Sequence, residues 1–222
     1  MRVFFRVDSS NEIGSGHLIR SLFLAKSLKE KGLDCTFISR DLNGNFNNLI
    51  SDMGFKLIPL KKPKIIENIN PVKSKSNYES WLKISFSEDA KEVINILQKK
   101  EIDLLIVDHY ALDIKWEKIL KKYVKKILVI DDLVNRNHFC DILIDPTYDR
   151  KPIDYQSLTN KNCIVFSGSD YAIINSKFSD QREKSIKRLF NKNKIKILVS
   201  LGGIDKYELS HKIIKILSKE KF

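Results

Sequence analysis

The sequence of 222 residues contains no apolar run of about 18 or more residues, so we expect no membrane-spanning segment and no stable membrane insertion. The N-terminus MRVFFRVDSS lacks the layout of a signal peptide, because its short apolar run ends in charged and polar residues. Cysteine is scarce: Cys35, Cys140 and Cys163 are widely spaced and form no CxxC pattern, which favours small buried thiols over a metal site or a disulfide. A cytoplasmic protein is the simplest interpretation.

Nucleic-acid signatures are also missing, although the net charge is +12. Lysine is spread over the expected helices, and no basic run is interleaved with aromatic residues. The charge has two explanations: solvated helix faces in a lysine-rich composition, or attraction to polyanions and anionic sugar nucleotides. We expect no nucleic-acid partner; a polyanion-binding protein would instead show tight, salt-dependent retention on DNA.

Strand and helix patterns alternate along the chain. The runs DLLIVD and KILVID are continuously apolar and end in aspartate, which is typical of parallel strands covered on both faces. Residues 61–80 contain two prolines and no clean period, so we expect a surface insertion there. The pattern predicts an α/β fold with a Rossmann-like, doubly wound parallel sheet. The expected strands are 3–7, 35–39, 56–60, 103–108, 126–131, 141–145 and 163–166, and the main helices are 16–31, 88–100, 113–124 and about 176–190.

A second unit begins near the C-terminus. The segment KIKILVSLGGID predicts a new strand and a glycine turn, and KYELSHKIIKILSKE predicts the helix that follows. Some 30 residues cannot bury a core of their own. We therefore divide the chain into a Rossmann-like domain, 1–190, and the incomplete start of a second domain, 191–222. Either the remainder of this second domain is separate or missing, or the segment packs onto the first domain.

The segment RVDSSNEIGSGHLIRS contains the first candidate site. Ligands of open parallel sheets bind beyond the carboxyl ends of the strands, and the first strand ends near Asp8. Gly14 and Gly16 allow a tight turn, and the free amides of the next helix favour negative charge. His17 would lie beside a substrate, where the helix end disfavours imidazolium and a neutral ring can accept a proton. The alternative is that His17 only caps the helix.

Arg20 follows one helical turn later and could pair with Asp8 or with a phosphate. The spacing is not the dinucleotide fingerprint GxGxxG, because Ile19 replaces the third glycine. A nicotinamide-dependent dehydrogenase is therefore disfavoured, and we expect no cofactor.

Polar residues follow other strands as well. Their shared position at one edge of a sheet suggests a substrate rim, although aspartate often caps the next helix, as we expect for Asp113. We interpret His138 and His211 as ordinary surface residues, and no His, Asp or Glu spacing predicts a metal site. The rim residues are Asp108, His109, Tyr110, Asp131, Asp132, Asp145 and Tyr148.

Several motifs together resemble a known family. RVDSSNEIGSGHLIRSLFLAKSL, DHYALDIKWE, VIDDL, CDILID, GSDYAIINSKF and VSLGGID occur in the order seen in the UDP-2,4-diacetamido-2,4,6-trideoxy-β-L-altropyranose hydrolases of pseudaminic acid biosynthesis. The resemblance covers essentially the whole chain. It implies similarity to GT-B glycosyltransferases such as MurG, with two Rossmann-like domains and the site between them, the first domain being 1–190 here.

The resemblance also implies roles for individual residues. The base that activates water matches His17; water attacks the anomeric carbon of a UDP-sugar, UDP leaves with inversion, and no metal is expected to be essential. Tyr110 lines the sugar pocket, and Gly202, Gly203 and Asp205 form the first nucleotide-binding loop of the second domain. The further residues expected to bind the substrate are Asp8, Gly14, Gly16, Arg20, Asp108, Asp132, Tyr171 and Asn175.

The sequence departs from the family pattern near its end. Ser169 replaces a proline, Asn175 an arginine and Lys177 an acidic residue, so the exact sugar is not fixed. Two other functions remain open. A glycosyltransferase of the same architecture would use His17 on an acceptor hydroxyl, with the insertion 61–80 as an acceptor or membrane patch. A truncated, non-catalytic binding module would bind without turnover.

Overall fold

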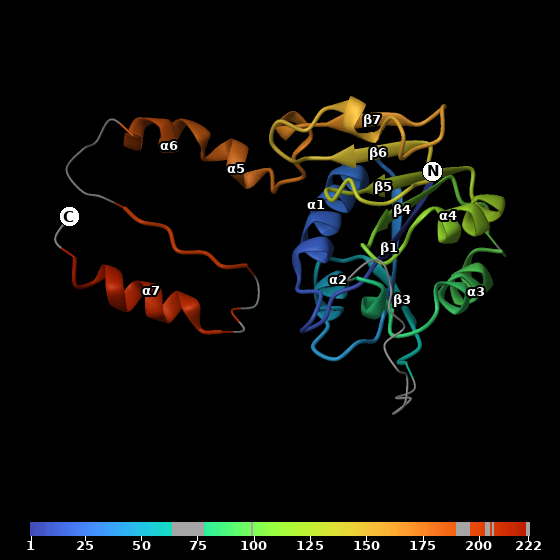
Figure 1. The fold of residues 1–222 in the computed structure, drawn as a ribbon, viewed down its shortest axis with the longest axis horizontal. Helices are drawn as coiled ribbons and strands as arrows, with labels where there is room; N and C mark the ends of the chain where they lie inside the picture. The colour runs from blue at the N-terminus through green and yellow to red at the C-terminus, as the bar shows by residue number, and fades with distance from the viewer. Residues whose placement is uncertain (64–77, 99, 190–195, 203–204, 206, 221–222) are drawn as a thin grey trace.

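The computed structural model describes residues 1–63, 78–98, 100–189, 196–202, 205 and 207–220. A seven-stranded sheet forms its centre, in the order β3-β2-β1-β4-β5-β6-β7, and every pairing is parallel (Figure 1). The predicted Rossmann-like α/β fold is therefore confirmed. The strands are β1 (Arg2–Val7), β2 (Asp34–Arg40), β3 (Lys56–Leu60), β4 (Leu104–Asp108), β5 (Lys126–Ile130), β6 (Ile142–Asp145) and β7 (Ile164–Ser167).

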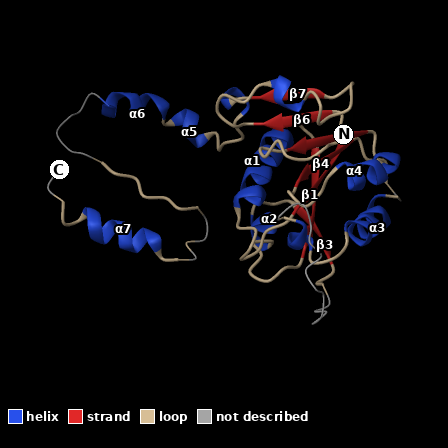
Figure 2. Ribbon diagram, in the orientation of Figure 1, coloured by secondary structure: helices blue, strands red, loops and turns tan. Residues whose placement is uncertain are grey.

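The central strands are apolar on both faces because helices cover both faces. All five residues of β4 are buried, as are Val3 to Val7 of β1. Figure 2 shows α1 (Gly16–Glu30) and α2 (Asn48–Asp52) on one side of the strands, and α3 (Phe86–Leu97) and α4 (Ile114–Leu120) on the other. Two core clusters result, one on each face of the sheet.

Local signals account for the helix ends. Gly32 has a φ of +82°, which a glycine adopts without strain, and it follows the last turn of α1 as predicted. The Asp113 carboxylate accepts a hydrogen bond from the Lys115 N–H at 2.8 Å, so the predicted cap of α4 is confirmed. Ser85 and Glu88 form a capping box at the start of α3.

The strand order places the crossover point beside β1. The chain builds β1, β2 and β3 outward in one direction and then returns to place β4 on the other side of β1. In such sheets the crevice for ligands opens at the carboxyl ends of the two strands that flank this switch point. Here those ends are Val7–Asp8 and Asp108, so the fold brings together the first two predicted rim segments.

The C-terminal segment differs from the prediction in two places. The expected helix of about 176–190 is divided at Gln181 into α5 (Lys177–Asp180) and α6 (Arg182–Leu189). Residues 196–200 form no strand, because a strand needs a partner for its backbone groups and the described residues supply none. Figure 1 shows α6 and α7 (Leu209–Leu217) apart from the sheet. The division at residue 190 stays a prediction.

The two edges of the sheet are β3 and β7, and they differ in sequence. β3 carries an exposed proline, Pro59, whereas β7 begins with Ile164, which is 57% exposed. Most of the insertion expected at 61–80 lies outside the described residues. Its last two residues, Glu79 and Ser80, begin a short 3-10 helix, η1 (Glu79–Leu82). Over the residues described, no helix has both the length and the apolar character needed to cross a bilayer.

Candidate active site

A tight turn carries the chain from β1 into α1. The Gly14 N–H donates to the Ser10 carbonyl at 2.8 Å, and Gly14 has a φ of +80°. The Ser10 hydroxyl accepts from the N–H groups of Glu12 and Ile13. Because this turn is short, α1 begins directly above the carboxyl ends of β1 and β4, and His17 lies in its first turn.

The imidazole of His17 contacts a carboxylate from β4. His17 Nδ1 lies 2.6 Å from Asp108 Oδ1. Burial alone would raise the pKa of Asp108, but the charges of His17 and Arg20 outweigh burial and lower that pKa to about 2. An ionised carboxylate only accepts hydrogen bonds, so the Nδ1 atom carries the proton and the lone pair of a neutral ring is on Nε2. This is the arrangement of a histidine oriented for proton transfer.

Arg20 ties the same carboxylate to the next strand. Its guanidinium binds Asp108 with two nitrogens, at 2.7 and 2.6 Å, and donates to Asp132 Oδ2 at 2.7 Å. Of the two partners expected for Arg20, Asp8 is therefore wrong, and a phosphate stays a prediction. The reason is geometric: one turn beyond His17, the side chain lies over the ends of β4 and β5, and Asp8 pairs with Arg6 from its own strand.

Aromatic rings cover the imidazole. The Tyr110 ring meets His17 edge to face at 4.4 Å between centroids, and Trp81 lies 5.9 Å from the same ring. Trp81 also stacks on Tyr110 at 5.5 Å, and the Tyr110 hydroxyl donates to Asp132. Burial, followed by Asp132, raises the pKa of Tyr110. The His17 side chain is consequently only 7% exposed.

We call His17, Arg20, Asp108, Tyr110 and Asp132 the switch-point cluster. Its residues come from four parts of the chain: helix α1, the last residue of β4, the segment after β4, and the segment after β5. Sequence reasoning found all five residues but did not single out Trp81. The aromatic spacing of Tyr78 and Trp81 was the available signal.

A second cluster lies beneath the first and is closed to solvent. Arg6 bridges Asp8 and Asp89, with its Nη2 at 2.9 Å from Asp8 Oδ2 and 2.6 Å from Asp89 Oδ2. Arg40 donates to Asp89 at 2.8 Å through its side chain and to Asp8 at 2.7 Å through its backbone N–H. All four side chains are at most 1% exposed. We call these residues the inner ion-pair network.

The inner network changes the interpretation of Asp8 and His109. Burial would raise the pKa of Asp8, but Arg6 and then His109 lower it well below its ordinary range. His109 Nδ1 accepts the Ala111 N–H at 3.1 Å, so its proton lies on Nε2, which faces Asp8 at 3.2 Å. Burial lowers the pKa of His109, which keeps the ring neutral. The prediction that Asp8 contacts substrate stays a prediction, although its carboxylate is paired within the protein.

His138 is not a surface residue, and that prediction is wrong. Its side chain is fully buried, with Nδ1 at 2.7 Å from Glu117 and Nε2 at 3.8 Å from Asp131. Burial would lower the pKa of His138, but Asp131 and Glu117 outweigh it and raise the pKa to about 9. The loop turns inward because these two buried carboxylates need a cation. His211, in contrast, is exposed as predicted.

The remaining predicted contacts lie elsewhere. Tyr171 is 45% exposed and packs on Phe166, and Asn175 accepts the Lys177 N–H. Asp205 accepts from the N–H groups of Leu209 and Ser210, beside Gly202 with its φ of +89°. Gly203 lies outside the described residues. Among the described residues, no hydrogen bond, ion pair or ring contact joins these side chains to the switch-point cluster.

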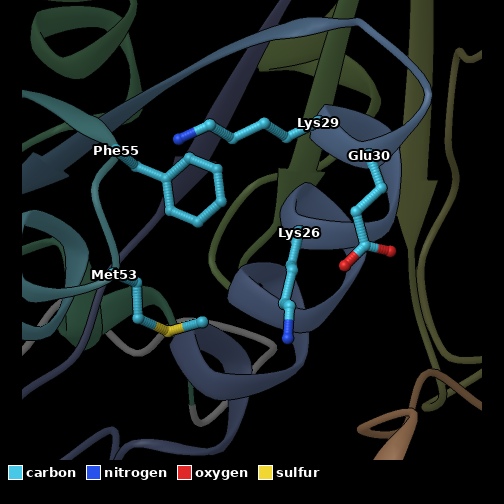
Figure 3. A pocket seen from close by; sticks show the side chains of 5 residues that line it. All are labelled: Lys26, Lys29, Glu30, Met53 and Phe55. Carbon is cyan, nitrogen blue, oxygen red and sulfur yellow. The ribbon is translucent and has the colours of Figure 1, made fainter.

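Two surface pockets lie along the outer face of α1, and His17 lines neither of them. One, of about 450 Å³, is lined by Lys26, Lys29, Glu30, Met53 and Phe55 (Figure 3). The other includes Phe23, Ile174 and Asn175. Lys26 lies nine residues beyond His17, or about 14 Å along the helix, so neither pocket is the crevice at the switch point. Within the described ranges, no group of three or more His, Cys, Asp or Glu side chains is arranged to hold a metal ion.

The chain is similar to two curated proteins and to chains of solved structures. It is 32% identical over all 222 residues to the UDP-2,4-diacetamido-2,4,6-trideoxy-beta-L-altropyranose hydrolase of Campylobacter jejuni subsp. jejuni serotype O:2, and spans 67% of that protein. It is 23% identical to the uncharacterized protein MJ1062 of Methanocaldococcus jannaschii, over 228 aligned residues that take in the whole chain and 41% of that protein. No family model matches the chain.

One of the similar solved structures is MurG of Acinetobacter baumannii. Its TM-score is 0.46 at 13% identity, over 68% of this chain and 42% of MurG. This likeness indicates nothing about activity.

Proposed function

This chain belongs to the family of UDP-2,4-diacetamido-2,4,6-trideoxy-β-L-altropyranose hydrolases, and from that premise we propose that it hydrolyses a UDP-linked diacetamido-trideoxy sugar in pseudaminic acid biosynthesis. The proposal extends to the cytoplasm as its place of action and to a further nucleotide-binding domain as its partner, whether on the same chain or separate. The identity over the whole chain supports it, and the chain spans 67% of the curated relative.

His17 is the general base of the proposed reaction. Nε2 takes a proton from water as the water oxygen bonds to the anomeric carbon. The bond from that carbon to the UDP oxygen breaks, and UDP leaves with the electron pair. Attack opposite the leaving group inverts the anomeric centre. Asp108 holds the ring through Nδ1 and stabilises the imidazolium that forms, which then returns its proton to solvent.

The rest of the proposed site binds the two halves of the substrate. The glycine turn at Gly14 and Gly16 leads into helix amides that favour the negative charge developing on UDP. The proposed contacts to sugar or nucleotide are Asp8, Gly14, Gly16, Arg20, Asp108, Tyr110, Asp132, Tyr171 and Asn175, with Gly202, Gly203 and Asp205 for the nucleotide.

One observation carries the assignment of His17: its Nδ1 lies 2.6 Å from a carboxylate on another element. A histidine that only caps its helix would place a ring nitrogen on an amide of α1. Instead, the ring is fixed from the side of β4, and Nε2 keeps its lone pair. This geometry supports a base acting at the carboxyl edge of the sheet.

The test compares His17→Asn with His211→Asn, a matched change at an exposed histidine on α7. UDP release is measured chromatographically from the UDP-sugar without any acceptor. We expect His17→Asn to lose about 10²–10⁴-fold in turnover while still binding the substrate in calorimetry, and His211→Asn to match the unmodified chain.

Other results would exclude the hydrolase. UDP release that requires an added acceptor sugar identifies a glycosyltransferase. Binding with no release identifies a binding module. Full turnover by His17→Asn removes this residue as the base.

A further inference from the structure

The fold brings together two of the three cysteines. Cys140 precedes β6, Cys163 precedes β7, and these strands pair in the parallel sheet with Ile142 opposite Ile164. As a result, Cys140 Sγ lies 3.5 Å from Cys163 Sγ, although 22 residues separate them in the sequence. Both are free thiols. The expectation of small buried thiols holds for Cys140, whereas Cys163 is only partly buried.

The two thiols have complementary surroundings. Cys140 is 3% exposed, whereas Cys163 is partly exposed after the exposed residues Lys161 and Asn162. The hydrogen bond between the sulfurs, in which either thiol can be the donor, lowers the pKa of Cys163 and raises the pKa of Cys140. A more acidic, reachable thiol beside a buried partner is the arrangement of an attacking and a resolving cysteine.

We propose that Cys140 and Cys163 form a reversible redox site, which a low-molecular-weight disulfide such as oxidised glutathione converts into an intramolecular disulfide. The Cys163 thiolate attacks one glutathione sulfur and expels the first glutathione thiolate, leaving a mixed disulfide. Cys140 loses its proton, attacks Cys163 Sγ and expels the second glutathione. Two protein thiols and one oxidised glutathione thus give one protein disulfide and two reduced glutathione molecules.

The bond would close a loop that supports the carboxyl edge of the sheet. This loop carries Tyr155, whose hydroxyl lies 2.9 Å from Asp145 and 3.0 Å from Asp131. It also carries Arg150, which donates to the Asp132 carbonyl at 3.3 Å. Oxidation would therefore restrict the segment that borders the switch-point cluster, without using any residue of that cluster.

The third cysteine is an internal control. Cys35 is 6% exposed and its thiol faces the Ala25 carbonyl at 3.8 Å. Burial, and then Asp34, raises the pKa of Cys35 to about 11. We therefore expect it to remain reduced under conditions that oxidise the other two.

The experiment exposes the folded 222-residue chain to buffers of increasing oxidised-to-reduced glutathione ratio, followed by acid quench, alkylation and tryptic mass spectrometry. We expect linkage of peptides 137–150 and 162–177, two hydrogens lighter than their sum, with peptide 32–40 fully alkylated. Cys140→Ser should stop at a glutathione adduct on Cys163, Cys163→Ser should stay unmodified, and Cys35→Ser should behave as the unmodified chain. The linked form should melt about 5–10 °C higher.

Three outcomes would overturn the proposal: no linkage in excess oxidised glutathione, equal reaction of Cys35, or a linked form that melts below the reduced chain. His17→Asn should oxidise as the unmodified chain does, so failure of the hydrolase proposal leaves this one intact.

Discussion

The switch-point cluster and the inner ion-pair network contain the same chemical groups in opposite settings. Each joins an arginine to two carboxylates from different elements: Asp8 after β1 and Asp89 of α3 in the inner network, and Asp108 of β4 and Asp132 after β5 in the switch-point cluster. In the inner network the side chains of Arg6 and Asp89 are both 0% exposed. In the switch-point cluster the side chains of Arg20 and Asp132 are 18% and 22% exposed. The inner charges pair with one another and hold α3 against β1 and β2, whereas the outer charges reach the edge of the sheet where a ligand would bind.

The largest effect should come from removing the carboxylate that orients the base. In Asp108→Asn, an amide can no longer fix the Nδ1 proton or stabilise imidazolium, so turnover should fall about 10²–10⁴-fold in a UDP-release assay. Asp132→Asn is the matched control, because Asp132 contacts Arg20 and Tyr110 in the same cluster. Equal losses in both variants would show that Asp108 acts through general packing rather than through His17.

Removing a charge from the inner ion-pair network should lower the free energy of unfolding. Asp89→Asn leaves Arg6 and Arg40 with one less buried negative charge, and should lower the free energy of unfolding by about 3–5 kcal/mol in urea titrations. Asp132→Asn should cost less, because solvent reaches its side chain. If the two changes cost the same, the distinction between a closed and an open cluster fails.

His138 is a third case: a buried cation that, unlike the arginines of the two clusters, loses its charge as the pH rises through about 9. Its pKa of about 9 lies above the ordinary 6.5, so its stabilisation is fully present below about pH 6.5 and is lost as pH rises through 9. The unfolding free energy should drop by about 3 kcal/mol across this window. His138→Gln should give a flatter profile there. A wild-type slope in that variant would assign the pH dependence to other groups.

The smallest effect on stability should come from breaking an ion pair on the protein surface. Lys83 and Glu12 form an ion pair in which both side chains are more than 40% exposed. Lys83→Ala should change the unfolding free energy by no more than about 0.5 kcal/mol at 0.15 M salt. A larger loss would mean that η1, which carries Trp81, is held in place by this contact.

Most of the sheet could be predicted from the sequence because each strand is a short run rich in apolar residues between turn residues. The strand expected in KIKILVSLGGID is the exception. Its apolar residues are sufficient for a strand, but no neighbour among the described residues completes its hydrogen bonds. Local pattern predicts an element only when its partner is present.

The candidate site was predictable in membership but not in pairing. His17, Arg20 and Asp108 are visible as strand-end residues, yet the ion pair of Arg20 spans 88 positions and depends on how α1 lies over β4. His138 was misassigned for a related reason: its loop is polar and nothing nearby in sequence signals the buried Glu117. Contacts between distant segments follow from the fold, which no single motif encodes.

Pro59 has a consequence for how the sheet can grow. The Leu60 carbonyl accepts the Asp41 N–H at 3.2 Å, so Leu60 turns its peptide groups toward β2 and its neighbour Pro59 turns outward. Proline has no amide hydrogen to offer a strand approaching from that side. The proline therefore disfavours pairing of a β-strand from another molecule with the edge strand β3. Of the two edge strands, β7 is the one that such a strand would join.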